Sequence, residues 1–221
     1  MAALHIAVFQ RRPRDGRHQA HAGPTQTGGC DVIADAAWSA AVHLITKRAV
    51  LRPWCREDLP AFFDIYSREE ITRWLGEHPR KALVDEVAAA QSLQRWIDTN
   101  EALKAPLGLW AIVPSTDGME RAPIGTVLLL PLREADGEVS EIEIGWHLHP
   151  QAHGSGWATE AAARLLQAAG DAGLRRVLAL VEPANEPSHR VARRLGLEDE
   201  GLSSRWFGVT AHQYVWRPPP D

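Results

Sequence analysis

The residues with the most chemical content are two glycines that flank a serine, Gly154-Ser155-Gly156. They follow a strand-like segment, 141–148, and an alanine-rich helical pattern begins directly after them. Glycine lets the backbone approach a ligand closely, and the free N–H groups and positive dipole end of a helix attract an anion. The pattern therefore predicts a phosphate-binding turn, although a tight strand-to-helix turn without a ligand has the same spacing.

A second strand-to-helix junction lies further along, where the apolar run 177–181 precedes Asn185 and Ser188. Together with the loop, this segment resembles the GNAT superfamily of acetyl-CoA-dependent N-acetyltransferases, and most closely the subgroup that acetylates ribosomal-protein N-termini. The family's loop begins with Arg or Gln, here Gln151, and its second junction carries Asn-x-x-Ser. Its opening, a basic pair followed by Leu-Arg-Pro-Trp, matches residues 47–54. The resemblance covers residues 46 to about 217.

The resemblance implies an α+β GNAT fold. Its central sheet is mixed and mostly antiparallel, helices flank it, and a parallel strand pair splays apart at the acetyl-CoA site. The implied activity is N-acetyl transfer from acetyl-CoA, as co-substrate, to a primary amine of a protein N-terminus or a small molecule, directly and through a tetrahedral intermediate. Because a fold does not guarantee chemistry, a catalytically degenerate acyl-CoA-binding sensor or interaction module is the alternative.

The resemblance also implies which residues hold the coenzyme. Backbone donors of the loop would bind its pyrophosphate, and the splayed strand would leave a free N–H near Trp146 to Leu148 for the oxyanion. Gln151 offers hydrogen bonding without the charge of the arginine that relatives often carry, so binding is expected to be weaker. The expected coenzyme-binding residues are Leu148, Gln151, Gly154, Ser155, Gly156, Trp157, Ala158 and Asn185.

Acetyl transfer to an amine also needs a general base, because a primary amine is mostly protonated at neutral pH and must lose a proton before it attacks. The resemblance places the hydroxyl of Ser188 beside the coenzyme sulfur, where it can donate to the leaving thiolate; a helix N-terminal hydroxyl is the other interpretation. Glu143 is the preferred base and Glu141 the second choice, since alternation puts both on one strand face. His147 shares that face, and a merely solvated strand face explains the pattern equally well.

Two other functions are disfavoured. The histidines at 147, 149 and 153 could suggest a metal site, but Pro150 and the glycine turn interrupt them and no carboxylate or cysteine follows at a useful spacing, so we expect none. A Rossmann nucleotide-binding domain would need an early fingerprint and repeated strand–helix alternation, whereas this loop lies past the middle of the chain.

Composition is that of an ordinary globular protein: 45% of residues are hydrophobic, 24% are charged and the net charge is −4. No basic field indicates a nucleic-acid partner, and no apolar run reaches membrane-helix length. Two cysteines, Cys30 and Cys55, make no disulfide framework, and Arg11-Arg12 lacks the apolar stretch of an export signal. We therefore expect a cytoplasmic monomer or homodimer with no nucleic-acid or membrane partner.

The chain divides into a flexible extension at 1–45, a GNAT domain at 46–217 and a short proline-rich tail at 218–221. Within the extension, 34–44 could form a short helix. Periodicity and breakers predict helices at 56–67, 69–75, 85–99, 157–172 and 191–195, and strands at 49–52, 107–113, 124–130, 138–148, 177–181, 205–207 and 212–216.

The acceptor amine stays open among protein N-termini, small amines such as aminoglycosides, and polyamines or free amino acids. Acidic Glu141 and Glu143 and the negative net charge favour a cationic acceptor. Of nine tryptophans, those in segments that surround the acceptor cleft in relatives are Trp54, Trp74, Trp110, Trp146 and Trp206. Most tryptophans are expected to pack in the core.

Overall fold

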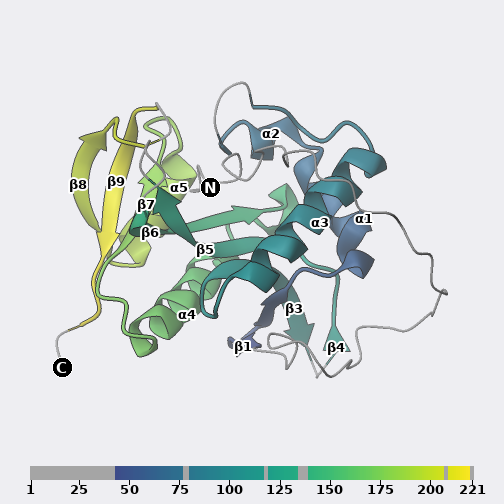
Figure 1. The fold of residues 1–221 in the computed structure, drawn as a ribbon, viewed down its shortest axis with the longest axis horizontal. Coiled ribbons are helices and arrows are strands. Elements are labelled where there is room, and N and C mark those ends of the chain that lie inside the picture. Colours follow the sequence, from purple (N-terminus) through teal and green to yellow (C-terminus); the bar gives the residue numbers. More distant parts are fainter. Residues whose placement is uncertain (1–42, 77–79, 117–118, 134–138, 207–208, 220–221) are drawn as a thin grey trace, which may run out of the picture.

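The computed structural model describes residues 43–76, 80–116, 119–133, 139–206 and 209–219. Their strands form one mixed sheet in the order β1-β2-β3-β5-β6-β7-β9-β8, with β4 paired to β3 (Figure 1). The strands are β1 (Leu44–Ile45), β2 (Ala49–Pro53), β3 (Gly108–Thr116), β4 (Met119–Glu120), β5 (Gly125–Arg133), β6 (Val139–Leu148), β7 (Val177–Val181), β8 (Glu198–Ser203) and β9 (Ala211–Trp216). All neighbours are antiparallel except β6 and β7. The expected α+β fold class is confirmed.

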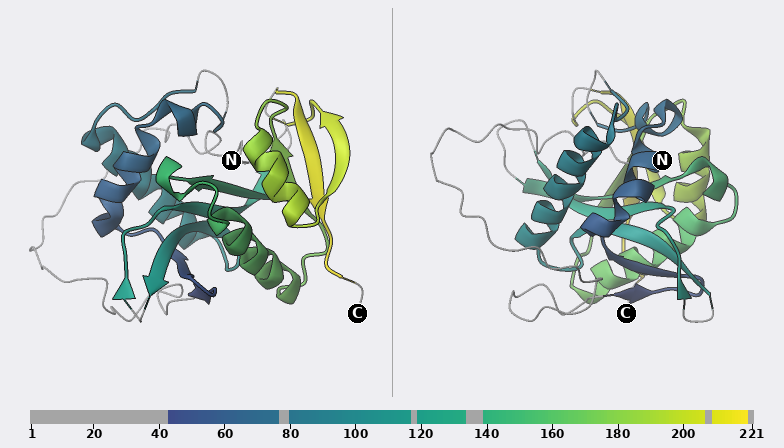
Figure 2. Two further views of the ribbon diagram at one scale, coloured as in Figure 1. Left: turned by 180° about the vertical axis from the view of Figure 1, so that it is seen from behind. Right: turned by 90° about the vertical axis from the view of Figure 1, so that its right-hand side faces the viewer.

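Helices cover both faces of this sheet, as the side view in Figure 2 shows. They are the 3-10 helices η2 (Arg56–Asp58) and η3 (Pro150–Ala152), and the α-helices α1 (Leu59–Tyr66), α2 (Glu69–Thr72), α3 (Glu86–Ala102), α4 (Trp157–Asp171) and α5 (Glu186–Arg194). The residues of α1 and α3 pack on one face with Leu128 and Leu130, and those of α4 pack on the other with Ile144 and Trp146. Strand alternation thus divides the apolar residues of β5 and β6 between two cores.

The parallel strands β6 and β7 diverge early. Within the described residues their register holds a single pair, Glu143 with Leu178. Beyond it, β6 continues paired only with β5 as far as Leu148, while β7 continues paired with β9 as far as Val181. The sheet therefore opens into a gap toward the loop at 154–156, which confirms the predicted splay and extends it back to Ile144.

The predicted helices and most predicted strands are confirmed, although α5 begins five residues before the helix predicted at 191–195, but the strand predicted at 205–207 is wrong in its described part. The segment 205–206 is not a strand; Arg205 instead lies over the ring of Trp206, at 4.4 Å from its centroid. The partner of β9 is β8. Its residues are acidic and mostly exposed, so they lack the alternation of apolar and polar residues from which a strand could be predicted. Edge strands tolerate such charge because one side of them faces water, and Arg176 and Arg217 pair with its glutamates.

The structure also contradicts the solvated strand face, which was the alternative interpretation of the acidic pattern in β6. Glu143 and His147 are both 0% exposed, because α1 and α3 cover the side of the sheet on which they lie. Only the first part of the strand, Val139 and Ser140, is exposed. The acidic alternation therefore marks a buried polar row and not a wet surface.

The expected extension lies outside the described residues up to residue 42, and with it most of the short helix predicted at 34–44. Leu44, its last residue, belongs to strand β1, which begins ahead of the predicted domain start at residue 46. In the described part of the chain, no helix has both the length and the apolar character needed to cross a bilayer.

Candidate active site

The loop before α4 has the backbone that an anion site needs. Gly154 and Gly156 have φ of 77° and 82°, the left-handed region that favours glycine, and Gly156 is the N-cap of α4. The first helical N–H groups, from Trp157 on, have no partner within the helix because no turn precedes them. They form the positive end of the helix dipole, so a phosphate group would bind there favourably.

Arg48, the residue directly before β2, holds this loop in place. Its Nη2 donates to the carbonyl of Ser155 at 3.1 Å, its Nε donates to Glu160 at 2.7 Å, and its guanidinium lies 4.2 Å from the ring centroid of Trp157. Burial would raise the pKa of Glu160, but hydrogen bonds from Thr46 and Arg48 outweigh it and leave the pKa below its usual value. Arg48 belongs to the basic pair noted in the sequence, but its neighbours along the chain do not indicate that it bonds to Ser155, more than a hundred positions away.

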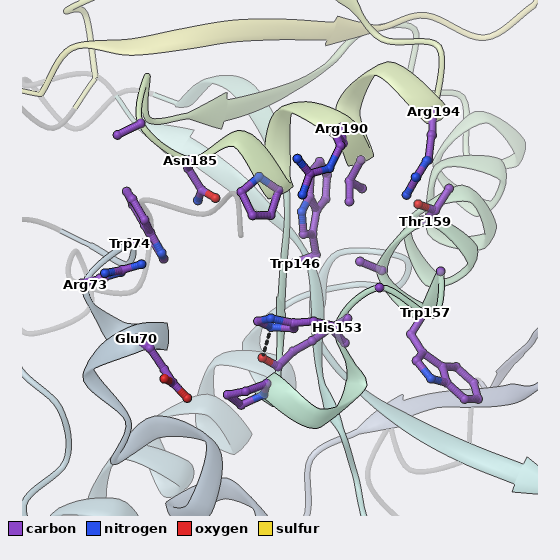
Figure 3. A pocket seen from close by; sticks show the side chains of 18 residues that line it. Glu70, Arg73, Trp74, Trp146, His153, Trp157, Thr159, Asn185, Arg190 and Arg194 are labelled. Carbon is purple, nitrogen blue, oxygen red and sulfur yellow. Dashed lines mark hydrogen bonds between the residues drawn. The ribbon is translucent and has the colours of Figure 1, made fainter.

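A pocket of about 670 Å³ opens at the splay and extends over the loop. Figure 3 shows α5 along one side, with the turn after α2 at one end and the N-terminus of α4 at the other. Its lining residues are Glu70, Arg73, Trp74, Trp146, Leu148, Pro150, His153, Gly154, Gly156, Trp157, Ala158, Thr159, Ala184, Asn185, Pro187, Arg190, Val191 and Arg194. This volume suits a small-molecule site.

Six of the expected coenzyme-binding residues line this one pocket: Leu148, Gly154, Gly156, Trp157, Ala158 and Asn185. Gln151 and Ser155 do not; both are exposed, and the Ser155 carbonyl is already bonded to Arg48. Gln151 lies in η3, where its own N–H donates to His149 Nδ1 at 3.2 Å. The pocket thus gathers most of the residues chosen from the loop motif.

The three expected catalytic residues lie apart from the lining. Ser188 is 0% exposed on the first turn of α5, and its Oγ has no hydrogen-bond partner among the described residues. Glu143 is equally buried, at the last paired position before the splay. Glu141 accepts a hydrogen bond from Arg176 Nε at 3.1 Å, two residues farther from the gap. Because Glu141 is engaged by Arg176 and lies farther from the gap, Glu143 is better placed than Glu141 to act as the base.

Within the described part of the chain, two lining groups are buried donors without an acceptor. Trp146 is 1% exposed, and neither its Nε1 nor the Oγ1 of Thr159 has a partner among the described residues. An unpaired buried donor costs roughly 1–3 kcal/mol, so such groups indicate a ligand that completes them. The amide carbonyls and phosphates of a coenzyme A chain are acceptors that fit, and these donors therefore agree with the coenzyme expected from the loop.

Several lining residues escaped the sequence analysis. Pro187, Arg190, Val191 and Arg194 repeat at spacings of three and four, one face of α5, so a full-length helix prediction from residue 186 would have indicated them. Glu70 and Arg73 belong to the four-residue α2 and the turn after it, beside Trp74, which the resemblance had already placed near the acceptor cleft. So short an element offers no periodicity from which a facing direction could be predicted.

Arg80 fixes the turn that carries Arg73 and Trp74. Its Nη1 donates to the Arg73 carbonyl at 2.6 Å, its Nε donates to the Gly76 carbonyl at 3.0 Å, and it forms an ion pair with Glu182 just after β7. The Arg80 side chain is 5% exposed. This one guanidinium therefore joins the turn after α2 to the far side of the splay and defines the distance between the two walls.

A chain of buried polar groups lies behind the splay. Trp54 Nε1 donates to Thr126 Oγ1 at 3.1 Å, and Tyr66 Oη lies 2.6 Å from Thr126 Oγ1 and 3.1 Å from His147 Nδ1. Burial raises the pKa of Tyr66 and lowers the pKa of His147 to about 3. His147 is therefore neutral at physiological pH and a poor acceptor of a substrate proton, which weakens its candidacy as the base.

The depressed pKa of His147 makes a prediction about stability. Between pH 6.5 and about pH 3, His147 is protonated in the unfolded chain but neutral in the folded chain. The free energy of unfolding therefore decreases as the pH falls through this range. The loss attributable to this residue approaches about 1.4 kcal/mol per pH unit. Urea unfolding of wild type and His147→Gln at pH 7, 6 and 5 should show the steeper fall in wild type; parallel curves would contradict the burial argument.

The three clustered histidines have separate partners. His147 contacts Tyr66, His149 Nε2 lies 3.1 Å from Asp64 Oδ2, and His153 Nε2 lies 3.0 Å from the Leu148 carbonyl oxygen. Among the residues that the structure describes, no group of three or more histidine, cysteine or acidic side chains is arranged to hold a metal ion.

A helix N-terminus that can bind phosphate, set against a splayed parallel strand pair in a mixed sheet, defines the acyl-CoA-dependent acyltransferases of the GNAT type. The chain belongs to the acetyltransferase (GNAT) domain family, whose model matches residues 48–198. It is accordingly an acyltransferase, and its coenzyme is acetyl-CoA.

Known proteins agree with this assignment. The uncharacterized N-acetyltransferase YnaD of Bacillus subtilis is 25% identical over 173 residues, which are 73% of this chain and 85% of YnaD. Two solved structures share the fold with a TM-score of 0.61: the ribosomal-protein-S5-alanine acetyltransferase of Vibrio fischeri (17% identity, 80% of this chain and 97% of that one) and the microcin C7 self-immunity acetyltransferase MccE in complex with acetyl-CoA and AMP (19%, 78% and 93%).

Proposed function

We propose that this protein transfers the acetyl group of acetyl-CoA to a primary amine. The observation that carries the proposal is the continuity of the pocket from the N-terminus of α4, across the splay, to the turn after α2. One end suits the phosphates of the coenzyme, and the other leaves room for a second substrate beside the thioester. Relatives named as N-acetyltransferases support an amine acceptor.

The coenzyme is held along α4 and α5. The N–H groups at Gly156 and Trp157 bind its pyrophosphate, and Arg190 and Arg194 lie on the same side of the pocket with charges that suit its phosphates (Figure 3). The indole N–H of Trp146 donates to the chain between phosphate and thioester. A backbone N–H on the unpaired edge of β6, between 146 and 148, stabilises the oxyanion, a contact that is worth about 3 kcal/mol of barrier in acyl transfer.

Two residues move the protons. Glu143 accepts the proton that the amine loses on attack, through a water at the start of the splay, because its carboxylate is buried behind the pocket wall. The Ser188 hydroxyl donates a hydrogen bond to the thiolate as the carbon–sulfur bond breaks. Because the amine is bound as an ammonium ion, its acetylation releases two protons: one ends on the coenzyme thiol and the other passes to solvent, so no further reactant is needed.

One form of the proposal has the N-terminal amine of a ribosomal protein as the acceptor. The ribosomal-protein-S5-alanine acetyltransferase of Vibrio fischeri shares the fold at 17% identity. A protein N-terminus would have to reach the amine position past Trp74. This form competes with a small-molecule acceptor, which the end of the pocket at Arg73 and Trp74 also accommodates, and cytoplasmic function suits either.

The test follows thiol release from acetyl-CoA with N-terminal peptides, aminoglycosides, polyamines and amino acids, and identifies the acetylated product by mass spectrometry. We expect release that depends on one amine class. Binding of acetyl-CoA in calorimetry without amine-dependent release would overturn the proposal in favour of an acyl-CoA-binding sensor.

A further inference from the structure

We infer that the acceptor carries an anionic group, a carboxylate or a phosphate, beside its amine, and that Arg73 binds this group while Trp74 contacts the adjoining part of the molecule. The inference rests on the proposed function and names the substrate class of the same site. It rests on how charge is distributed along the pocket.

The pocket has cationic side chains at both ends. Arg190 and Arg194 lie toward Thr159 and the N-terminus of α4, whereas Arg73 lies at the opposite end beside Trp74, with Asn185 and Trp146 between them (Figure 3). Acetyl-CoA carries all its negative charges at the nucleotide end, and its thioester end is neutral. With the phosphates at α4, the coenzyme brings no charge to Arg73, so that cation is left for the second substrate.

Among the described residues, no carboxylate neutralises the charge on Arg73. No ion pair of this side chain with a described carboxylate occurs; the guanidinium instead lies 4.6 Å from the ring centroid of Trp74. Arg68, earlier in the chain, is by contrast paired with Asp64 at 2.6 Å. A planar guanidinium stacked on an aromatic ring keeps its N–H donors free for two-point binding of a carboxylate or phosphate.

The position of this arginine is fixed at the backbone. Arg80 holds the Arg73 carbonyl and pairs with Glu182 across the splay, so the turn cannot swing away without breaking a buried ion pair. Preorganisation of this kind lowers the entropy cost of binding. Trp74 is partly buried in the same turn and presents a flat surface against which a ring or an aliphatic chain can pack.

Glu70 lies one helical turn before Arg73 and lines the same end. Although their spacing allows an ion pair, the described side chains form none between them. A carboxylate and a guanidinium held apart on one wall match a zwitterion, with the ammonium toward Glu70 before deprotonation and the acid toward Arg73. Amino acids have this arrangement, whereas polycationic aminoglycosides would meet repulsion from Arg73.

An acceptor with an anionic group therefore replaces the purely cationic acceptor that was expected from the sequence. Two of the three supports for a cationic acceptor were Glu141, which is paired with Arg176, and Glu143, which is buried behind the pocket wall. Neither offers a negative surface to a substrate. The net charge of −4 concerns the whole chain and says nothing of this pocket, where arginines outnumber carboxylates.

The experiment compares kcat/KM for matched amines: phenylalanine with phenylalaninamide, and O-phosphoethanolamine with ethanolamine. Wild type should prefer the acid over its neutral partner by about 10- to 100-fold in at least one pair, and the pair that responds distinguishes carboxylate from phosphate. Arg73→Ala should abolish that preference, and Arg73→Lys should restore part of it. The ratio between variant and wild type cancels the intrinsic difference in amine reactivity.

Arg68→Ala is the matched control, because it removes an arginine at the start of α2 that lies outside the pocket and should leave the preference unchanged. An acid preference that survives Arg73→Ala, or better use of neutral or polycationic amines by wild type, would overturn the inference and leave the transferase proposal intact. Absence of turnover with every amine, despite acetyl-CoA binding, would overturn both.

Discussion

Glu143→Gln is expected to lower kcat for amine acetylation by about 100- to 1,000-fold, the range typical for loss of a positioned general base. Glutamine has the size and shape of glutamate and can accept and donate hydrogen bonds, but it cannot take a proton from the attacking amine. Because Glu143 does not line the pocket, the affinity for acetyl-CoA should change little. Steady-state thiol release and calorimetric titration separate these two effects.

The matched control for this prediction is Glu141→Gln. Both glutamates lie on the same face of β6, but Glu141 is bonded to Arg176 and lies farther from the gap. It should retain kcat within a few-fold and lose at most a little stability, since exposed or half-exposed ion pairs contribute about 1 kcal/mol or less. Equal losses in the two variants would contradict a catalytic role for Glu143, and so would full activity of Glu143→Gln in a folded protein.

Gly154→Glu is expected to weaken acetyl-CoA binding by about 100-fold or more, which is about 2.7 kcal/mol. The carboxylate would lie in the pocket wall that receives the pyrophosphate, and two like charges about 4 Å apart repel by about 4 kcal/mol near a protein surface. The backbone adds strain, because φ at this position is 77°. Calorimetric titration with acetyl-CoA measures the loss directly.

Gly173→Glu separates the effect of charge at the site from the effect of strain. Gly173 has φ of 88°, follows the C-terminal end of α4, and has open space around its Cβ position, as Gly154 does. It is not a pocket residue. We expect it to reproduce the loss of stability but to bind acetyl-CoA with wild-type affinity. If Gly154→Glu also binds normally, the loop is not the pyrophosphate anchor.

The sequence predicts the parts of this protein that depend on neighbours along the chain. The turn at 154–156 could be found because glycine, helix start and preceding strand lie within a few residues of each other, and β7 because five buried apolar residues stand together. The same local motifs also predicted four further residues that line the pocket: Leu148, Trp157, Ala158 and Asn185.

What the sequence could not predict depends on contacts between distant segments. The bond from Arg48 to Ser155 joins positions 107 apart, and Arg80 meets Glu182 only because the turn after α2 returns to the end of β7. Burial of Glu143 and His147 depends on α1 and α3 covering a strand whose own pattern indicates a wet face. The acidic β8 becomes a strand only through its pairing with β9.

The single ladder pair between β6 and β7 also has a thermodynamic consequence. Across that junction the described strands share only this one ladder pair, so the two parts of the molecule are joined there mainly by core packing and by the Arg176–Glu141 and Arg80–Glu182 ion pairs. A ligand that binds only the folded chain raises its stability by mass action. Because acetyl-CoA would lie in this gap, the heat tolerance of the protein in a cell becomes tied to the acetyl-CoA supply and falls when the metabolite is scarce.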